Sequence, residues 1–285
     1  MSTPDSPGNK NIYFLDSESA AEMARLLDMD RAITEGMGGL LPEVPDFAGI
    51  RSVLDVACGP GGWAQEIAFA HPDIEVVGFD IGETMIKYAN AQAAIQGLDN
   101  LTFHVMDMQE PLDFLDQSFD LTNARSINFL PVDAWPRLVG EMARVTRPNG
   151  IVRLTESEWW YFTNSPALER LNSVIIRSIK ARGSYSESGL FTGVLPMLGR
   201  LLMDAGCQDV QYTPHVIDFS YGAKAHEAFR RSNQVTFKLF QPQMVQLGIA
   251  KQEDLERDYE QMVIDMMRED FRGLMFILTA WGRRK

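Results

Sequence analysis

The chain has 285 residues and carries 26 Lys and Arg against 39 Asp and Glu, a formal net charge of −13 that supplies no positive field for a nucleic-acid backbone. No apolar run approaches the ~18 residues that cross a bilayer, and the start MSTPDSPGNK is polar, so we expect a cytoplasmic protein with no membrane or nucleic-acid partner. The only cysteines, Cys58 and Cys207, predict neither a disulfide framework nor a Cys/His metal site.

The first predicted element, residues 11–41, is one or two helices that end at the break MGGLLP. Apolar side chains recur there at helical spacing, at Leu26, Leu27, Met29, Ile33 and Met37. The segment precedes the first predicted strand and lies outside the strand and helix alternation that follows.

The stretch VLDVACGPGGWA at 53–64 predicts a strand, a glycine turn and the start of a helix. Gly59, Gly61 and Ala64 match the GxGxxG/A turn of dinucleotide sites, which by itself is a weak signal. Asp55, at the strand end, would lie beside two anionic phosphates in an NAD site, whereas it would attract the ammonium and sulfonium groups of S-adenosylmethionine. The acid therefore favours S-adenosylmethionine over NAD.

Two further strands are predicted to end in acids at the same edge of the sheet. IEVVGFD at 74–80 ends in Asp80, 25 positions after Asp55, where an acid that binds ribose hydroxyls is expected. A helix over 82–97 follows and stops at a glycine. LTFHVMDM then places Asp107 to accept from an adenine amino group and Met108 to pack on the ring.

These segments resemble the class I S-adenosylmethionine-dependent methyltransferases, most closely the small-molecule branch that includes the ubiquinone and menaquinone biosynthesis enzymes. The resemblance rests on LDVACGPGGW, VVGFDIGETMIKYAN, MDMQEPLDFLDQSFDLTNAR and GEMARVTRPNG, and it covers residues 50–158. It implies an α/β fold, a doubly wound seven-stranded and mostly parallel sheet, whose last strand is antiparallel. The candidates for the last two strands are 208–220 and 273–281. Residues 119–131 lack the Asn-Pro-Pro-Tyr motif of enzymes that methylate adenine bases or glutamine, which argues against those substrates.

We expect a single domain over 1–285, with the cofactor-binding core at 50–158 and an antiparallel strand within 271–285. The resemblance implies that 11–41 covers the cofactor and that 159–190 and 223–270 are substrate-lid insertions, the latter with two helices. The aromatic and methionine content of these insertions suggests a mostly apolar pocket.

The expected cofactor contacts come from the strand ends and the N-terminal segment. Arg125 is a candidate for the methionine carboxylate of the cofactor or for an anionic substrate, and Tyr13 for the same carboxylate. The full expected set is Tyr13, Met37, Asp55, Ala57, Gly59, Gly61, Asp80, Ile81, Met85, Asp107, Met108, Asn123 and Arg125.

Methyl transfer is an in-line displacement, so a base is needed only if the acceptor must lose a proton. The candidate bases are Glu156, at the end of the fifth strand, and His215, in the sixth, although a single strand histidine is more typical of packing. The expected substrate pocket contains Asn128, Phe129, Trp159, Trp160 and Tyr185.

The leading hypothesis is methyl transfer from S-adenosylmethionine to a small, largely apolar metabolite, with oxygen, nitrogen and carbon acceptors all open and S-adenosylhomocysteine as the product. A protein that binds the cofactor without transferring its methyl group is the alternative, and an NAD-dependent oxidoreductase is a weaker one. The sequence makes no prediction of the oligomeric state.

Overall fold

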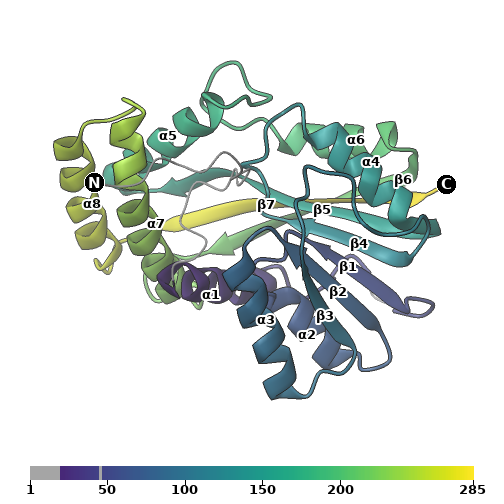
Figure 1. The fold of residues 1–285 in the computed structure, drawn as a ribbon. Coiled ribbons are helices and arrows are strands. Elements are labelled where there is room, and N and C mark those ends of the chain that lie inside the picture. The colour runs from purple at the N-terminus through teal and green to yellow at the C-terminus, as the bar shows by residue number, and fades with distance from the viewer. Residues whose placement is uncertain (1–19, 45–46) are drawn as a thin grey trace, which may run out of the picture.

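Seven strands form one sheet in the computed structural model, which describes residues 20–44 and 47–285 (Figure 1). The strand order is β3-β2-β1-β4-β5-β7-β6; β7 runs antiparallel to both of its neighbours, β5 and β6, and the other neighbouring strands are parallel. This order confirms the predicted doubly wound, mostly parallel α/β sheet. The strands are β1 (Ser52–Val56), β2 (Glu75–Asp80), β3 (Leu101–Val105), β4 (Phe119–Arg125), β5 (Thr146–Thr163), β6 (Cys207–Asp218) and β7 (Gly273–Arg284).

Helices cover both faces of the sheet, which is why all five residues of β1 are buried. Side chains alternate along a strand, so Val53 joins the apolar layer under α2 and α3 while Leu54 joins the layer under α4 and α6 (Figure 1). The helices are α1 (Ala20–Gly36), α2 (Gly62–Ala70), α3 (Glu83–Gln96), α4 (Trp135–Val145), α5 (Pro166–Lys180), α6 (Leu198–Asp204), α7 (His226–Gln246) and α8 (Gln252–Met266), with a 3-10 turn at Leu195–Met197.

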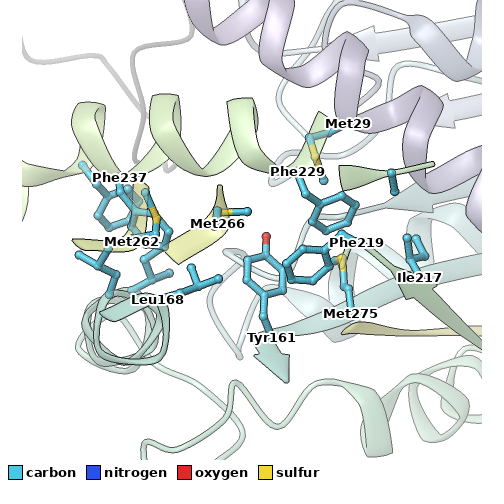
Figure 2. Packing of buried hydrophobic residues seen from close by; sticks show 14 of the residues in the cluster. Met29, Tyr161, Leu168, Ile217, Phe219, Phe229, Phe237, Met262, Met266 and Met275 are labelled. Carbon is cyan, nitrogen blue, oxygen red and sulfur yellow. The ribbon is translucent and has the colours of Figure 1, made fainter. Parts of the chain in front are cut away.

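A third apolar cluster lies where the long strands β5 and β7 extend among α5, α7 and α8 (Figures 1 and 2). In it the rings of Phe219 and Phe229 stack with centroids 4.5 Å apart, and Tyr161 meets Phe219 edge-on at 5.2 Å. Residues 159–163, expected at the start of a lid insertion, continue β5, and residues 161–163 pair with β7, Tyr161 opposite Met275. Residues 223–270 hold the two helices α7 and α8.

In the described ranges, no helix is long and apolar enough to cross a bilayer, and no group of three or more His, Cys, Asp or Glu side chains is placed to hold a metal ion. Residues 11–19 lie outside those ranges, and the rest of the predicted N-terminal helical segment forms the single helix α1 before the turn at 37–40.

The turn between β1 and α2 needs a left-handed backbone, with φ of +55° at Gly59, +80° at Gly61 and +54° at Ala57. Gly61 is also tightly packed, since a Cβ there would lie 2.5 Å from the ring of Phe103 on β3. Because Gly61 has no side chain, the turn can pack directly against Phe103 of β3.

We expect Gly61→Ala to lower the free energy of unfolding by roughly 2–4 kcal/mol, because left-handed strain of about 1 kcal/mol adds to overpacking of about 1–3 kcal/mol. Gly97→Ala is the matched control, since Gly97 has φ +68° but open space around the added methyl group. Urea unfolding of both variants measures the difference, and equal losses would contradict the role of the Phe103 contact.

Candidate active site

A cavity opens at the carboxyl edge of the parallel strands, the edge where open α/β sheets bind ligands. The segments after β1, β2, β3 and β4 line it, and α1, α5, α7 and the ends of β5 and β7 complete it. The empty space between these elements, counted together with the open mouth, is about 1510 Å³.

Asp80, at the tip of β2, is held in place by backbone amides. Its Oδ2 accepts from the N–H of Gly59 at 3.0 Å and its Oδ1 from the N–H of Gly82 at 2.8 Å. Burial raises the pKa of Asp80 above its usual value, and these amide bonds oppose the rise. Each carboxylate oxygen keeps a further lone pair, so the oriented group can still accept from a pair of ligand hydroxyls.

Asp107, just after β3, has one oxygen satisfied and one not. Its Oδ1 accepts from the N–H of Gln109 at 2.9 Å, whereas its buried Oδ2 has no hydrogen-bond partner in the part of the chain that the structure describes. Met85, Met106 and Met108 line the same part of the cavity. An unmet acceptor beside methionine side chains fits the amino group and the flat ring of adenine.

Arg125, at the end of β4, joins the sheet to α1. Its guanidinium is paired with Asp30 and donates to Thr34 Oγ1 at 2.9 Å. Arg125 and Asp30 both line the cavity, so this ion pair helps to hold α1 against the cavity.

The structure brings ten of the expected site residues together in the cavity wall. They are Ala57, Gly59, Asp80, Ile81, Met85, Asp107, Met108, Arg125, Asn128 and Phe129. Met37 lies instead in the third apolar cluster, and Tyr185 donates to the carbonyl of Val132 at 3.4 Å. Tyr13 and the side chains of Trp159 and Trp160 lie outside what the structure describes.

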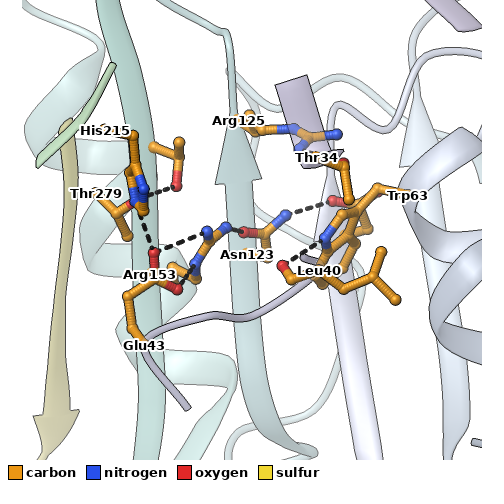
Figure 3. A network of polar contacts seen from close by, with 11 residues as sticks. Thr34, Leu40, Glu43, Trp63, Asn123, Arg125, Arg153, His215 and Thr279 are labelled. Atoms are coloured by element: carbon orange, nitrogen blue, oxygen red, sulfur yellow. Dashed lines mark hydrogen bonds and ion pairs between the residues drawn. The ribbon is translucent and has the colours of Figure 1, made fainter. Parts of the chain in front are cut away.

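Asp55 does not line the cavity but bonds to a buried polar network, whose members Asn123 and Arg153 are labelled in Figure 3. Asn123 donates to Asp55 Oδ1 at 2.8 Å, and Arg153 donates to Asn123 Oδ1 at 2.7 Å. Burial raises the pKa of Asp55 to about 7, opposed by Asn123 and Arg153. Because Asp55 is not part of the cavity wall, it is not placed to make the direct contact with a cationic ligand that the sequence suggested. Asp55 and Asn123 instead support the strands beneath the glycine turn.

The same network holds His215, which also does not line the cavity. Its Nε2 lies 3.2 Å from Glu43 Oε1 and 3.5 Å from Thr279 Oγ1 (Figure 3). Glu43 also pairs with Arg153 at 3.2 Å. The ring thus shares a buried carboxylate with an arginine, the arrangement expected of a structural histidine.

Glu156, near the centre of β5, lies behind the cavity wall. Its Oε1 accepts from the N–H of Ile127 at 2.7 Å, and its Oε2 is buried without a partner among the described residues. Burial, the largest influence, raises the pKa of Glu156 well above its usual value. The neighbouring Glu158 accepts from Thr192 Oγ1 at 2.6 Å and from the N–H of Gly193 at 2.8 Å, so it fastens the loop before α6.

We expect Glu156→Gln to keep kcat within about threefold, whereas loss of a general base costs about 10²- to 10⁴-fold.

The same variant also tests whether the Glu156 carboxyl is protonated in the folded enzyme. When folding raises the pKa of a carboxyl, the folded protein loses stability as the pH rises from the pKa of the unfolded state, about 4.5, through the pKa of the folded state. Glu156→Gln should therefore gain stability relative to the parent chain at pH 8 but not at pH 4. A 100-fold fall in kcat, or a stability difference that does not change with pH, would contradict this account.

Sequence reasoning missed the cavity residues that come from the helices. Asp30 lies on α1, Asn172 on α5, and Asn233 and Thr236 on α7. A signal was present on α7, where polar residues fall at helical spacing among phenylalanines that the structure buries.

The methyltransferase-domain family profile matches residues 53–150, from β1 into β5. The demethylmenaquinone methyltransferase of Geobacillus kaustophilus is 28% identical over 193 residues, which cover 64% of this chain and 80% of that protein. Among solved structures, the YcgJ protein of Bacillus subtilis has a TM-score of 0.56 at 18% identity, over 88% of this chain and 99% of that one.

Another solved structure, Haemonchus contortus phosphoethanolamine N-methyltransferase 2 with phosphomonomethylethanolamine and S-adenosylhomocysteine, has a TM-score of 0.56 at 14% identity, over 97% of this chain and 60% of that one. At these identities the two structures show a shared fold.

The family profile and the demethylmenaquinone methyltransferase relative support a class I S-adenosylmethionine-dependent methyltransferase, and the solved structures share its fold. Within that class the chain resembles the menaquinone and ubiquinone biosynthesis branch, as its motifs predicted. The predictions of an enzyme and of S-adenosylmethionine as its cofactor are confirmed, and the alternative of an NAD-dependent oxidoreductase is therefore rejected.

Proposed function

We propose that the enzyme methylates a small, largely apolar metabolite. The observation that carries the proposal is the wall of the cavity beyond the strand ends, where apolar side chains from four separate elements converge: Met29 and Ile33 of α1, Tyr161 of β5, Phe237 of α7 and Met275 of β7. Such a wall binds an acceptor through apolar contact. The Geobacillus relative acts, by its name, on demethylmenaquinone, which supports an acceptor of that kind.

The strand-end residues fit the cofactor in this proposal. Asp80 would accept from the ribose hydroxyls, and the unmet Oδ2 of Asp107 would accept from the adenine amino group beside Met108. The bound cofactor supplies an activated methyl group. The chain's own task is then to hold the acceptor atom in line with that carbon and to exclude water.

The acceptor side of the described cavity wall favours acceptors that need no strong base. Burial raises the pKa of Tyr161 to about 12, so its phenol keeps its proton at neutral pH. Asp30 is paired with Arg125. We therefore expect acceptor atoms that are nucleophilic as they stand or that ionise readily in solution.

The test is the formation of S-adenosylhomocysteine from S-adenosylmethionine across a panel of phenols, hydroquinones, amines and β-dicarbonyl compounds, measured by liquid chromatography with mass detection. We expect turnover with an apolar, readily ionised acceptor and none with phosphorylated or polyhydroxylated ones. Tight cofactor binding without product from any acceptor would favour a protein that does not transfer the methyl group, and turnover confined to strongly polar acceptors would contradict the proposed class.

A further inference from the structure

One part of the cavity contains a polar group that an apolar acceptor leaves unexplained. Asn172, on α5, has no exposed surface and lines the cavity, yet neither its Nδ2 nor its Oδ1 has a hydrogen-bond partner among the described residues. A buried amide left without partners is destabilising, and native proteins satisfy nearly all such groups. An unmet carboxamide in a cavity wall therefore points to a ligand that meets it.

The buried face of α7 adds polar side chains to the same cavity. Ser232, Asn233 and Thr236 line it and are each at most 5% exposed. The contact of Asn233 Nδ2 is the sulfur of Met266 at 3.9 Å, a weak acceptor. A helix face that served packing alone would be apolar throughout, so these residues extend the polar part of the wall.

The charge in this region is balanced. Arg25 lines the cavity, and Glu22, which is fully buried, accepts from its Nε at 2.7 Å and from a terminal nitrogen at 2.6 Å. The other terminal nitrogen of Arg25 donates to Ser232 Oγ at 3.1 Å. Tyr161 adds a hydroxyl that points away from its strand towards Met266 (Figure 2). The region is therefore polar without a net charge from this pair.

We infer that Asn172 and Asn233 bind a neutral hydrogen-bonding group of the methyl acceptor, a carbonyl oxygen next to a hydroxyl or N–H; this inference rests on the proposed function. A carboxamide presents a donor beside an acceptor, and its complement is a group that does the same. A carboxylate would set negative charge against the Asn172 oxygen, and an ammonium group would leave the Asn172 N–H groups unmet.

Four probes with the same ring separate these chemistries: 2-hydroxyacetophenone, benzoate, benzylamine and ethylbenzene. Their dissociation constants are measured by NMR titration on the enzyme saturated with S-adenosylhomocysteine. We expect 2-hydroxyacetophenone to bind at least fivefold more tightly than the other three. In Asn172→Leu that preference should vanish and ethylbenzene should bind at least as tightly, while the unfolding temperature without probe should rise because the unmet amide is gone.

Asn100→Leu is the matched control, since the Asn100 amide donates to the carbonyls of Ala68, His71 and Ile74 outside the cavity. It should lower the unfolding temperature and keep the probe preference. The inference is overturned if benzoate or benzylamine binds tightest, if Asn172→Leu keeps the parent preference or lowers the unfolding temperature, or if no probe binds the enzyme holding S-adenosylhomocysteine. Failure to bind S-adenosylhomocysteine itself would instead overturn the proposed function, and this inference with it.

Discussion

Asp80→Ala should weaken the binding of S-adenosylhomocysteine by at least about 100-fold. The carboxylate can accept two hydrogen bonds from ribose hydroxyls, and bonds to a charged group contribute about 1.5–3 kcal/mol each, while 1.4 kcal/mol is tenfold in affinity. The substitution also releases the amides of Gly59 and Gly82, which the side chain orients. Isothermal titration calorimetry measures the affinity, and circular dichroism checks that the variant is folded.

Asp99→Ala is the control for this prediction. It removes the same charge from an exposed position in the turn between α3 and β3, away from the cavity. Its affinity for S-adenosylhomocysteine should equal that of the parent chain. If folded Asp80→Ala bound within threefold of the parent, the ribose role of this acid would be refuted.

Arg153→Met should lower the free energy of unfolding by about 3–5 kcal/mol, the usual cost of removing one partner of a buried ion pair. The side chains of Arg153 and Glu43 are 1% and 0% exposed, so the variant leaves a buried carboxylate without its cation. It also removes the donor to Asn123, which in turn holds Asp55 beneath the glycine turn. Urea unfolding measures the loss.

Two comparisons sharpen that experiment. Arg51→Met removes an ion pair of 2.6 Å with Asp73 whose side chains are 67% and 71% exposed, and such pairs contribute little, so its urea midpoint should hardly move. The double change Arg153→Met with Glu43→Leu should recover part of the loss, because no buried charge is left alone. Equal effects of Arg153→Met and Arg51→Met would show that the network of Figure 3 does not stabilise the fold.

The expected positions of Asp80 and Asp107 follow from local rules. Each acid ends an apolar run, parallel strands present their carboxyl ends at one edge, and the structure places both side chains in the cavity wall. The doubly wound parallel sheet was likewise expected from the alternation of elements, and the antiparallel last strand from the family resemblance. Features that follow from the regular alternation of strands and helices can therefore be predicted from the sequence.

The roles of Asp55, His215 and Glu156 depended on contacts that no local pattern records. Asp55 meets Asn123 and His215 meets Glu43, partners separated by 68 and 172 positions along the chain, and Glu156 accepts from a backbone amide 29 positions before it. Burial by these distant segments raises the pKa values of Asp55 and Glu156, and none of the three side chains lines the cavity.

The sequence by itself therefore determined the class of enzyme, its cofactor and the strand-end residues expected to hold that cofactor, because these depend on short-range order within β and α units. Only the tertiary structure decided which helix residues reach the cavity, where Arg25 of α1, Asn172 of α5 and Asn233 of α7 are part of the wall. The sequence of a helix does not show whether a polar residue faces water or a cavity, because the packing of helices that are distant in the chain decides this.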